Sequence, residues 1–259
     1  MTNPTASIQL IVFGERNQTD LPGVLSEVAT AGFPAFEAGN LYASFGESTV
    51  RELLAKNSLA VSGAHFGYGD FADNAKFEAH LAYCVKAGIT NLMCSGVADS
   101  KTVEGYKASA KRFNEIGKQS KDAGLAFNYH NHAWEFDDLG GINGMQILAT
   151  ETDPELVKFN IDVFWVWYGN HDPAKFIADH ANRAGYFHFK DGKRRIDENG
   201  KTRPHFLELG TGDVDLKVAY AAAVAAGATW ITAEQDSTAL TALESATISR
   251  AFIKNELGI

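Results

Sequence analysis

The residues that decide the predicted fold are Leu125-Ala-Phe-Asn-Tyr-His-Asn-His-Ala-Trp-Glu135, which follow Ala123-Gly124. A helix can end at this glycine, because glycine adopts the left-handed conformation of a helix C-terminus without steric cost. Alternation then separates two faces, with Leu125, Phe127 and Tyr129 on one and Ala126, Asn128, His130 and His132 on the other. The stretch therefore predicts a β-strand with an apolar back and a front that ends in two imidazoles, with Glu135 in the loop that follows.

Three later apolar stretches repeat this arrangement near their C-terminal ends. Lys158-Phe-Asn-Ile-Asp162 ends on Asp162, Tyr186-Phe-His-Phe-Lys-Asp191 carries His188, and Trp230-Ile-Thr-Ala-Glu234 ends on Glu234. A single histidine on one strand is more often a hydrogen-bonded core residue than a ligand. Imidazole or carboxylate groups at four successive strand ends are not explained by solvation. The pattern therefore predicts a divalent-metal site made by His130, Asp162, His188 and Glu234.

An Ala-Gly pair recurs along the chain where a predicted helix leads into a predicted strand. Ala-Gly pairs at 31–32, 87–88, 123–124 and 226–227 each close a helical stretch and open an apolar run. A helix that leads through glycine into a short strand is an αβ unit, and its repetition predicts a parallel sheet. Eight such units in about 250 residues match an α/β fold, the closed (β/α)8 TIM barrel, as one domain over residues 1–259. An open doubly wound sheet is the alternative, although Phe13-Gly-Glu-Arg-Asn-Gln18 is not its Gly-rich phosphate turn.

The expected strands are residues 7–13, 34–37, 60–65, 90–94, the opening stretch, 157–162, 185–189 and 229–234. The expected helices are residues 21–31, 47–57, 73–87, 101–123, 144–151, one that starts at Asp172-Pro173, 215–226 and 240–257. Asp20 and Asp172 are the predicted N-caps. The polar segment from Asp191 interrupts this rhythm with a predicted hairpin turn at Asp197-Glu-Asn-Gly200, and we expect residues 191–205 to form a lid or a rim wall.

Composition narrows the class of protein. The chain has 45% hydrophobic residues, a formal charge of −9 and a pI near 5.4, which disfavours nucleic acid and anionic membranes as partners. Residues 1–6 lack the features of a signal peptide, and no apolar run reaches the roughly 20 residues that span a bilayer. We therefore expect a cytoplasmic protein that acts on a small molecule, with a homo-oligomer left open. Cys84 and Cys94 are expected to be reduced, buried thiols.

The predicted metal site implies a particular chemistry. Two imidazoles and two carboxylates suit Mn²⁺, Fe²⁺, Co²⁺ or Zn²⁺ better than Ca²⁺ or Mg²⁺. We expect Mn²⁺, with the other transition metals and Mg²⁺ as alternatives. Two carboxylates leave such a divalent centre about neutral, so it can bind a neutral polyol or ketose and polarise its oxygens.

Further polar and aromatic residues are expected at the same rim. His132, Glu135 and Lys190 are candidates for proton transfer, and Glu37 and His65 end two earlier strands, where we expect them to contact substrate. A salt bridge inside the barrel mouth is the alternative for Glu37. Trp165 follows strand 157–162 and is a candidate stacking wall for a sugar, although core packing would explain it equally well.

At these residues the sequence resembles the xylose isomerase-like barrels known as sugar phosphate isomerases/epimerases. The resemblance rests on Tyr129-His-Asn-His-Ala-Trp-Glu-Phe136, Asn160-Ile-Asp-Val-Phe-Trp165, Phe187-His-Phe-Lys-Asp191, Glu208-Leu-Gly-Thr-Gly212 and Ala233-Glu-Gln-Asp236. Many members of that family hold a metal with Glu, Asp, His and Glu on strands five to eight. Asp162, His188 and Glu234 match the last three, whereas His130 stands where those relatives have glutamate. Either His130 ligates instead, or Glu135 restores the carboxylate and frees His130 for proton transfer.

The resemblance also implies two reaction types. One is isomerisation or 3-epimerisation of a ketose through an enediolate. The other is β-elimination or hydration, as in relatives that act on keto-inositols and 3-keto-glycosides. Elimination needs an acid besides the base, and His132 with Glu135 and a second histidine supplies one, which favours this branch. The rivals from other classes are a non-catalytic carbohydrate-binding barrel and a metal-dependent nuclease, which the charge of −9 opposes.

Overall fold

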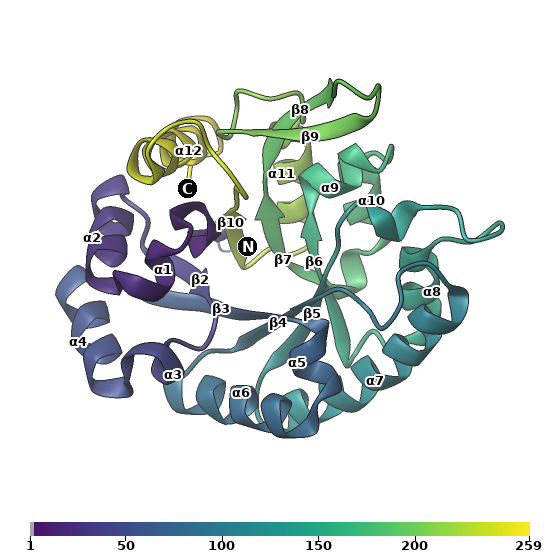
Figure 1. Cartoon of the computed structure of the whole chain (residues 1–259), viewed down its shortest axis with the longest axis horizontal. Coiled ribbons are helices and arrows are strands. Elements are labelled where there is room, and N and C mark those ends of the chain that lie inside the picture. Colours follow the sequence, from purple (N-terminus) through teal and green to yellow (C-terminus); the bar gives the residue numbers. More distant parts are fainter. Residues whose placement is uncertain (1–2) are drawn as a thin grey trace.

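Eight parallel strands form a closed barrel in the computed structural model, which describes residues 3–259 (Figure 1). Around the barrel the strands follow the order β1-β10-β7-β6-β5-β4-β3-β2, and β2 pairs again with β1. The predicted (β/α)8 TIM barrel is confirmed. The barrel strands are β1 Thr5–Gln9, β2 Ala35–Ala38, β3 Ala60–Gly67, β4 Asn91–Ser95, β5 Ala126–His130, β6 Val157–Asp162, β7 Ala184–Phe189 and β10 Trp230–Ala233.

Helices surround the barrel, as Figure 1 shows. They are α1 Arg16–Thr19, α2 Leu21–Ala31, α3 Leu41–Phe45, α4 Glu47–Asn57, α5 Tyr68–Ala72, α6 Asn74–Ala87, α7 Val103–Asp122, α8 Gly144–Glu151, α9 Val163–Tyr168, α10 Pro173–Asp179, α11 Leu216–Ala225 and α12 Ala242–Glu256. Short 3-10 helices occur at η1 Leu10–Phe13, η2 Trp134–Phe136 and η3 Ala181–Arg183. Within residues 3–259, none of the helices combines the length and apolar character that a bilayer crossing requires.

The predicted helix signals act as expected. The side chain of Asp20 accepts from the Gly23 amide at the start of α2, and Asp172 accepts from the first-turn amides of α10. At the other end of α2, Gly32 adopts φ +89°, a left-handed conformation that lets the chain turn directly into the next strand. Capping by side chains satisfies amides that the helix itself leaves unpaired, so these residues fix where each helix begins.

The opening stretch forms β5, and its two faces differ as predicted. Phe127 and Tyr129 point outward, where both rings pack against Phe113 of α7. His130 points into the barrel, because its ring lies 5.0 Å from that of His65 on β3 and 4.6 Å from that of His188 on β7. The strand ends at His130, so the alternation predicted as far as residue 132 stops two residues early.

The end of the first strand differs from the prediction, whereas the hairpin after β7 agrees with it. The strand predicted over residues 7–13 is wrong for residues 10–13, which form η1 because the Gln9 side chain accepts from the Ile11 amide and starts a helical turn. The segment after β7 forms an antiparallel hairpin of β8 Asp191–Ile196 and β9 Thr202–Leu207, which confirms the predicted turn. Its buried base is held by Asp191, whose carboxylate accepts from the backbone amides of Gly192, Gly210, Gly212 and Val214.

Candidate metal centre

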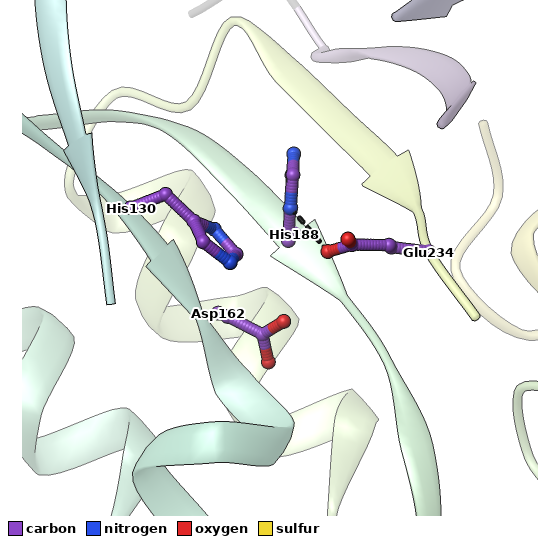
Figure 2. A group of neighbouring side chains, drawn as sticks. All are labelled: His130, Asp162, His188 and Glu234. Carbon is purple, nitrogen blue, oxygen red and sulfur yellow. Dashed lines mark hydrogen bonds and ion pairs between the residues drawn. The ribbon is translucent and has the colours of Figure 1, made fainter. Parts of the chain in front are cut away.

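Four polar side chains at the C-terminal ends of adjacent strands meet inside the barrel mouth. They are His130 of β5, Asp162 of β6, His188 of β7 and Glu234, which follows β10. All are buried, and one ligand atom from each lies within 4.8 Å of the others. Figure 2 shows the four side chains pointing toward a common space. The strand register places Asp162 directly opposite His188, which explains why groups from separate strands arrive at the same height.

The donor set fits a divalent cation. Asp162 Oδ2 and His130 Nδ1 are buried and have no hydrogen-bond partner within residues 3–259. Buried polar atoms nearly always have hydrogen-bond partners, so two such atoms without one, on residues of the same group, are compatible with a bound cation. His188 Nδ1 lies 2.5 Å from Glu234 Oε2, which brings a third and a fourth ligand atom to the same place. Two imidazoles with two carboxylates form a mixed nitrogen and oxygen set of the kind that holds first-row divalent metals.

Asn131 and the start of α9 fix the orientation of Asp162. Asn131 Oδ1 accepts from the Asp162 amide at 3.0 Å, and its Nδ2 donates to the Asp162 carbonyl at 3.4 Å. These two bonds tie the end of β5 to the end of β6. Asp162 Oδ1 accepts from the Trp165 amide as the N-cap of α9, which leaves Oδ2 to face the centre. The sequence motif therefore places a ligand, His130, beside a residue that holds the next ligand.

Glu37 supports two histidines from below the centre. Its Oε2 accepts from His188 Nε2 at 2.8 Å, and its Oε1 lies 2.8 Å from His65 Nδ1. Glu37 is fully buried, and although burial favours its neutral form, the His188 charge outweighs it and lowers the pKa of Glu37 to about 2. A carboxylate behind a ligand histidine orients the ring and fixes its tautomer. Glu37 thus lies in the barrel-mouth salt bridge that was the alternative to substrate contact, and His65 is the member of this pair nearer the surface.

Lys190 brings a positive charge to the same group of carboxylates. Its Nζ donates to Asp236 Oδ2 at 2.9 Å and lies 3.4 Å from Asp162 Oδ2 and 3.5 Å from Glu234 Oε2. Burial disfavours the charged amine, but the three carboxylates outweigh that effect and raise the pKa of Lys190 above its usual value. Asp236 was not predicted as a site residue, because the sequence gives no sign that it pairs with Lys190, the residue that follows β7.

The two acidic candidate ligands differ in pKa because their surroundings differ. Burial raises the pKa of Asp162 to about 7, and the charge of Lys190 only partly opposes that rise. Burial acts in the same direction on Glu234, but Lys190 and His188 outweigh it and hold the pKa of Glu234 well below its usual value. For His188, the attraction of Glu37 and Glu234 overcomes the burial that disfavours its charge and raises its pKa to about 10.

The loop after β5 holds His132 and Glu135 in different places. The Glu135 carboxylate is fully buried, accepting from the Tyr129 hydroxyl at 2.7 Å and from the His132 amide at 2.8 Å. It does not belong to the four-ligand group. His132 stacks on Trp134 at 3.9 Å, and its ring lies 4.8 Å from that of His130. Burial, with a contribution from Lys190, lowers the pKa of His132 to about 3, whereas burial raises the pKa of Glu135 to about 7.

Aromatic side chains enclose the part of the barrel mouth that contains His132 and Lys190. Trp165 lies 5.6 Å from His132 and 5.6 Å from Phe206, measured between ring centroids. Lys190 Nζ is 5.1 Å from the centroid of Trp165 and 5.3 Å from that of Phe206, so the ammonium lies among aromatic rings. Phe206 belongs to β9, which makes the hairpin part of the rim wall. Sequence reasoning predicted the segment but not this residue, since nothing in its pattern marks Phe206 as facing the site.

Fold and centre together define a TIM-barrel enzyme with a candidate divalent-metal centre. The chain belongs to the xylose isomerase-like TIM barrel family, whose model matches residues 25–255. It is similar to the inosose dehydratase of Geobacillus thermodenitrificans (strain NG80-2), which is 26% identical over 270 residues that cover 91% of this chain and 89% of that protein. The resemblance inferred from the sequence and the expectation of an enzyme are both confirmed.

Solved structures share the fold at low identity. A sugar phosphate isomerase/epimerase from Parabacteroides distasonis ATCC 8503 has a TM-score of 0.82 at 18% identity and is covered over 98% of each chain. A xylose isomerase-like TIM barrel protein from Mycobacterium smegmatis, solved in complex with magnesium, has a TM-score of 0.71 at 18% identity, with 97% of this chain and 95% of that chain covered.

Proposed function

We propose that the protein is a divalent-metal-dependent lyase of the dehydratase type that acts on a keto-sugar or keto-polyol. In this reaction a proton is removed from the carbon next to a ketone, and a hydroxyl or alkoxyl group then leaves from the next carbon. The observation that carries the proposal is the convergence of His130, Asp162, His188 and Glu234 beside His132 and Lys190. The similarity to an inosose dehydratase over most of both chains supports the same chemistry.

Mn²⁺ is the proposed ion, with Co²⁺, Fe²⁺, Zn²⁺ and Mg²⁺ as alternatives. A ring nitrogen of His130, Asp162 Oδ2, His188 Nδ1 and a Glu234 oxygen would hold it. A bound ion would supply Lewis acidity toward the ketone oxygen and so make the neighbouring C–H more acidic. The magnesium complex of the mycobacterial barrel supports divalent-cation binding within the family but not the choice of metal. In this role His188 would keep its Nε2–H bond to Glu37, which orients the ring.

His132 and Lys190 form the proposed base and acid. His132 Nδ1 has no hydrogen-bond partner within residues 3–259, so a ring nitrogen is free to accept the carbon-bound proton. The carboxylates around Lys190 keep its amine protonated and able to donate to the departing oxygen. Environments that push two pKa values apart are the usual mark of such a pair. Both groups flank Trp165, which would lie against one face of the substrate ring. In the elimination a C–H and a C–O bond break and a C=C bond forms. His132 takes the proton from carbon, and Lys190 gives a proton to the departing oxygen.

Glu135 is assigned a positioning role instead of the acid–base role expected from the sequence. Both of its oxygens are occupied by Tyr129 and His132, and none of its side chain is exposed. The bond to the His132 amide holds the turn that carries the imidazole. Glu135 would therefore influence the reaction through the placement of His132 and not by contact with substrate.

Isomerisation or 3-epimerisation is the second candidate. The same base could remove the proton, and a protonated Lys190 could return one to the opposite face of the same carbon in epimerisation, or to the neighbouring carbon in isomerisation, without loss of a hydroxyl. The fold shared with a sugar phosphate isomerase/epimerase supports this second candidate.

Turnover in D₂O separates these reactions. Metal-stripped protein would be reconstituted with each divalent ion and given keto-inositol and 3-keto-glycosides, with products followed by NMR and by enone absorbance. Elimination predicts an enone and no sugar epimer, whereas epimerisation predicts deuterium at the stereocentre without enone. His132→Gln and Lys190→Met should each slow the reaction by about 10²–10⁴-fold. Unchanged rates in both variants, or full activity in metal-free protein, would refute the proposal.

A further inference from the structure

The barrel mouth has a second, chemically different half. A cavity of about 470 Å³ opens at the ends of β1, β2 and β3, none of which carries any of the four candidate metal ligands. Its volume falls within the roughly 300–1,000 Å³ typical of small-ligand pockets. Its lining comes from the strand ends and from η1, α1, α3 and α6.

The lining combines polar with apolar side chains, and among residues 3–259 it includes no lysine, arginine, aspartate or glutamate. Amide side chains dominate its polar part, and three of them use one end to hold the protein backbone. Gln9 Oε1 accepts from Ile11, Asn17 Nδ2 donates to Leu10, and Asn40 Oδ1 accepts from Ala43. Because one end of each amide is fixed by the backbone, the group can offer its other end to a ligand with little loss of side-chain entropy. Such a surface offers both donors and acceptors, as hydroxyl groups require.

His65 joins this cavity to the metal centre. It lines the cavity, yet its ring lies 5.0 Å from that of His130 and 5.7 Å from that of His188. Its Nε2 is buried without a partner within the described chain, while its Nδ1 is held by Glu37. Beside it, Phe66 and His80 stack at 3.8 Å and present a flat surface. His65 therefore lies between the cavity and the candidate metal centre, so a ligand with one ring at each would contact it.

Charge near the cavity argues against an anionic ligand. Arg16 of α1 is the nearby cation, and its guanidinium is engaged by Glu27 and Asp20. A phosphate group needs arginine, lysine or several backbone amides directed at it, and a neutral amide lining leaves its charge uncompensated.

We propose that this cavity binds a neutral, hydroxyl-rich second ring of the substrate, so that the substrate class is an unphosphorylated keto-glycoside and not a single-ring sugar or a sugar phosphate. The inference rests on the proposed function, because it takes the ketone-bearing ring to lie at the centre formed by His130 and its neighbours.

Binding can be tested without turnover. The Mn²⁺-reconstituted protein would be titrated calorimetrically with three disaccharides of different linkage (trehalose, sucrose and cellobiose), with their 6-phosphates and with methyl glucoside. We expect at least one disaccharide to bind tenfold or more tightly than methyl glucoside, and its phosphate to bind more weakly than the neutral form. If no disaccharide binds more tightly than methyl glucoside, or if a phosphate binds best, the inference is overturned.

Two variants locate the effect. Gln18→Ala removes an exposed amide of the lining and should weaken disaccharide binding roughly threefold to tenfold, the loss of about one hydrogen bond. Ala43→Trp adds bulk at the lining and should weaken it further. Gln119→Ala, an exposed amide on α7, is the matched control and should leave binding unchanged. Equal affinities in Gln18→Ala, Ala43→Trp and wild type would place the second ring elsewhere.

Turnover separates this inference from the proposed function. The 3-keto derivatives of the same disaccharides and of methyl glucoside would be compared by kcat/KM. Turnover of both with equal kcat/KM would keep the chemistry and reject the subsite. Tight disaccharide binding without turnover of either keto derivative would keep the subsite and reject the chemistry.

Discussion

Replacing Lys190 by methionine should destabilise the metal-free protein far more than the metal-bound protein. The ammonium lies 3.4 and 3.5 Å from oxygens of Asp162 and Glu234 and is buried with them. At those distances each attraction is about 5 kcal/mol at an effective dielectric constant of about 20, and much of it offsets the cost of burying the charges. Removing one partner of such a buried group typically costs about 3–5 kcal/mol. Proton uptake by Asp162, whose pKa is already raised to about 7, should keep the loss near the lower value.

Urea unfolding in EDTA and in saturating Mn²⁺ measures this effect. A bound divalent ion would place positive charge beside the same carboxylates, so Mn²⁺ should restore most of the stability lost in the variant. Lys175→Met is the matched control, because Lys175 forms an exposed ion pair with Asp179 whose loss should cost no more than about 1 kcal/mol. Equal losses in EDTA and Mn²⁺, or no loss in EDTA, would refute this account of Lys190.

Three further outcomes follow from the contacts around the centre. Tyr129→Phe removes the hydroxyl that donates to buried Glu135 and should cost about 1–3 kcal/mol of unfolding free energy, measured in urea; an unchanged midpoint would contradict it. Because burial raises the pKa of Glu135 to about 7, its contribution is fully present below its unfolded pKa of about 4.5 and is lost as pH rises through 7. Wild type should therefore lose stability relative to Glu135→Gln between pH 5 and pH 8, and a difference that stays constant across that range would exclude the raised pKa. Phe206→Ala should raise KM without changing metal content, since Phe206 packs on Trp165 and is not one of the four candidate ligands; loss of metal or an unchanged KM would show that the hairpin plays another part.

Much of the barrel and the height of the candidate ligands could be predicted because both depend on short-range patterns. A strand repeats every two residues, so the faces of β5 follow directly from Phe127 to His130. Parallel pairing brings strand ends to one edge, so Asp162 and His188 could be expected to meet. The end of β1 could not be predicted in this way, because the Gln9 side chain replaces strand pairing with a local bond to Ile11.

The roles of the two remaining glutamates depend on contacts that the sequence does not contain. Glu37 meets His188 across 151 residues, so its part in holding that ring is visible only once the barrel is closed. Glu135 accepts a hydrogen bond from Tyr129. Because Tyr129 lies on the apolar face of its strand, the sequence pattern does not predict that its hydroxyl has a polar partner. The alternation pattern correctly predicts that this tyrosine is in the core. It does not predict the hydrogen bond to Glu135, which holds the loop that carries His132.

Metal binding to variants of His130, Glu135 and Asp162 tests the central claim most directly. Equilibrium dialysis with elemental analysis would compare wild type, His130→Gln, Glu135→Gln and Asp162→Ala. The geometry predicts one tightly bound divalent ion in wild type and in Glu135→Gln, at least tenfold weaker binding in His130→Gln, and loss of the ion in Asp162→Ala. Full occupancy in His130→Gln and Asp162→Ala, or loss of the ion in Glu135→Gln alone, would contradict the proposed centre.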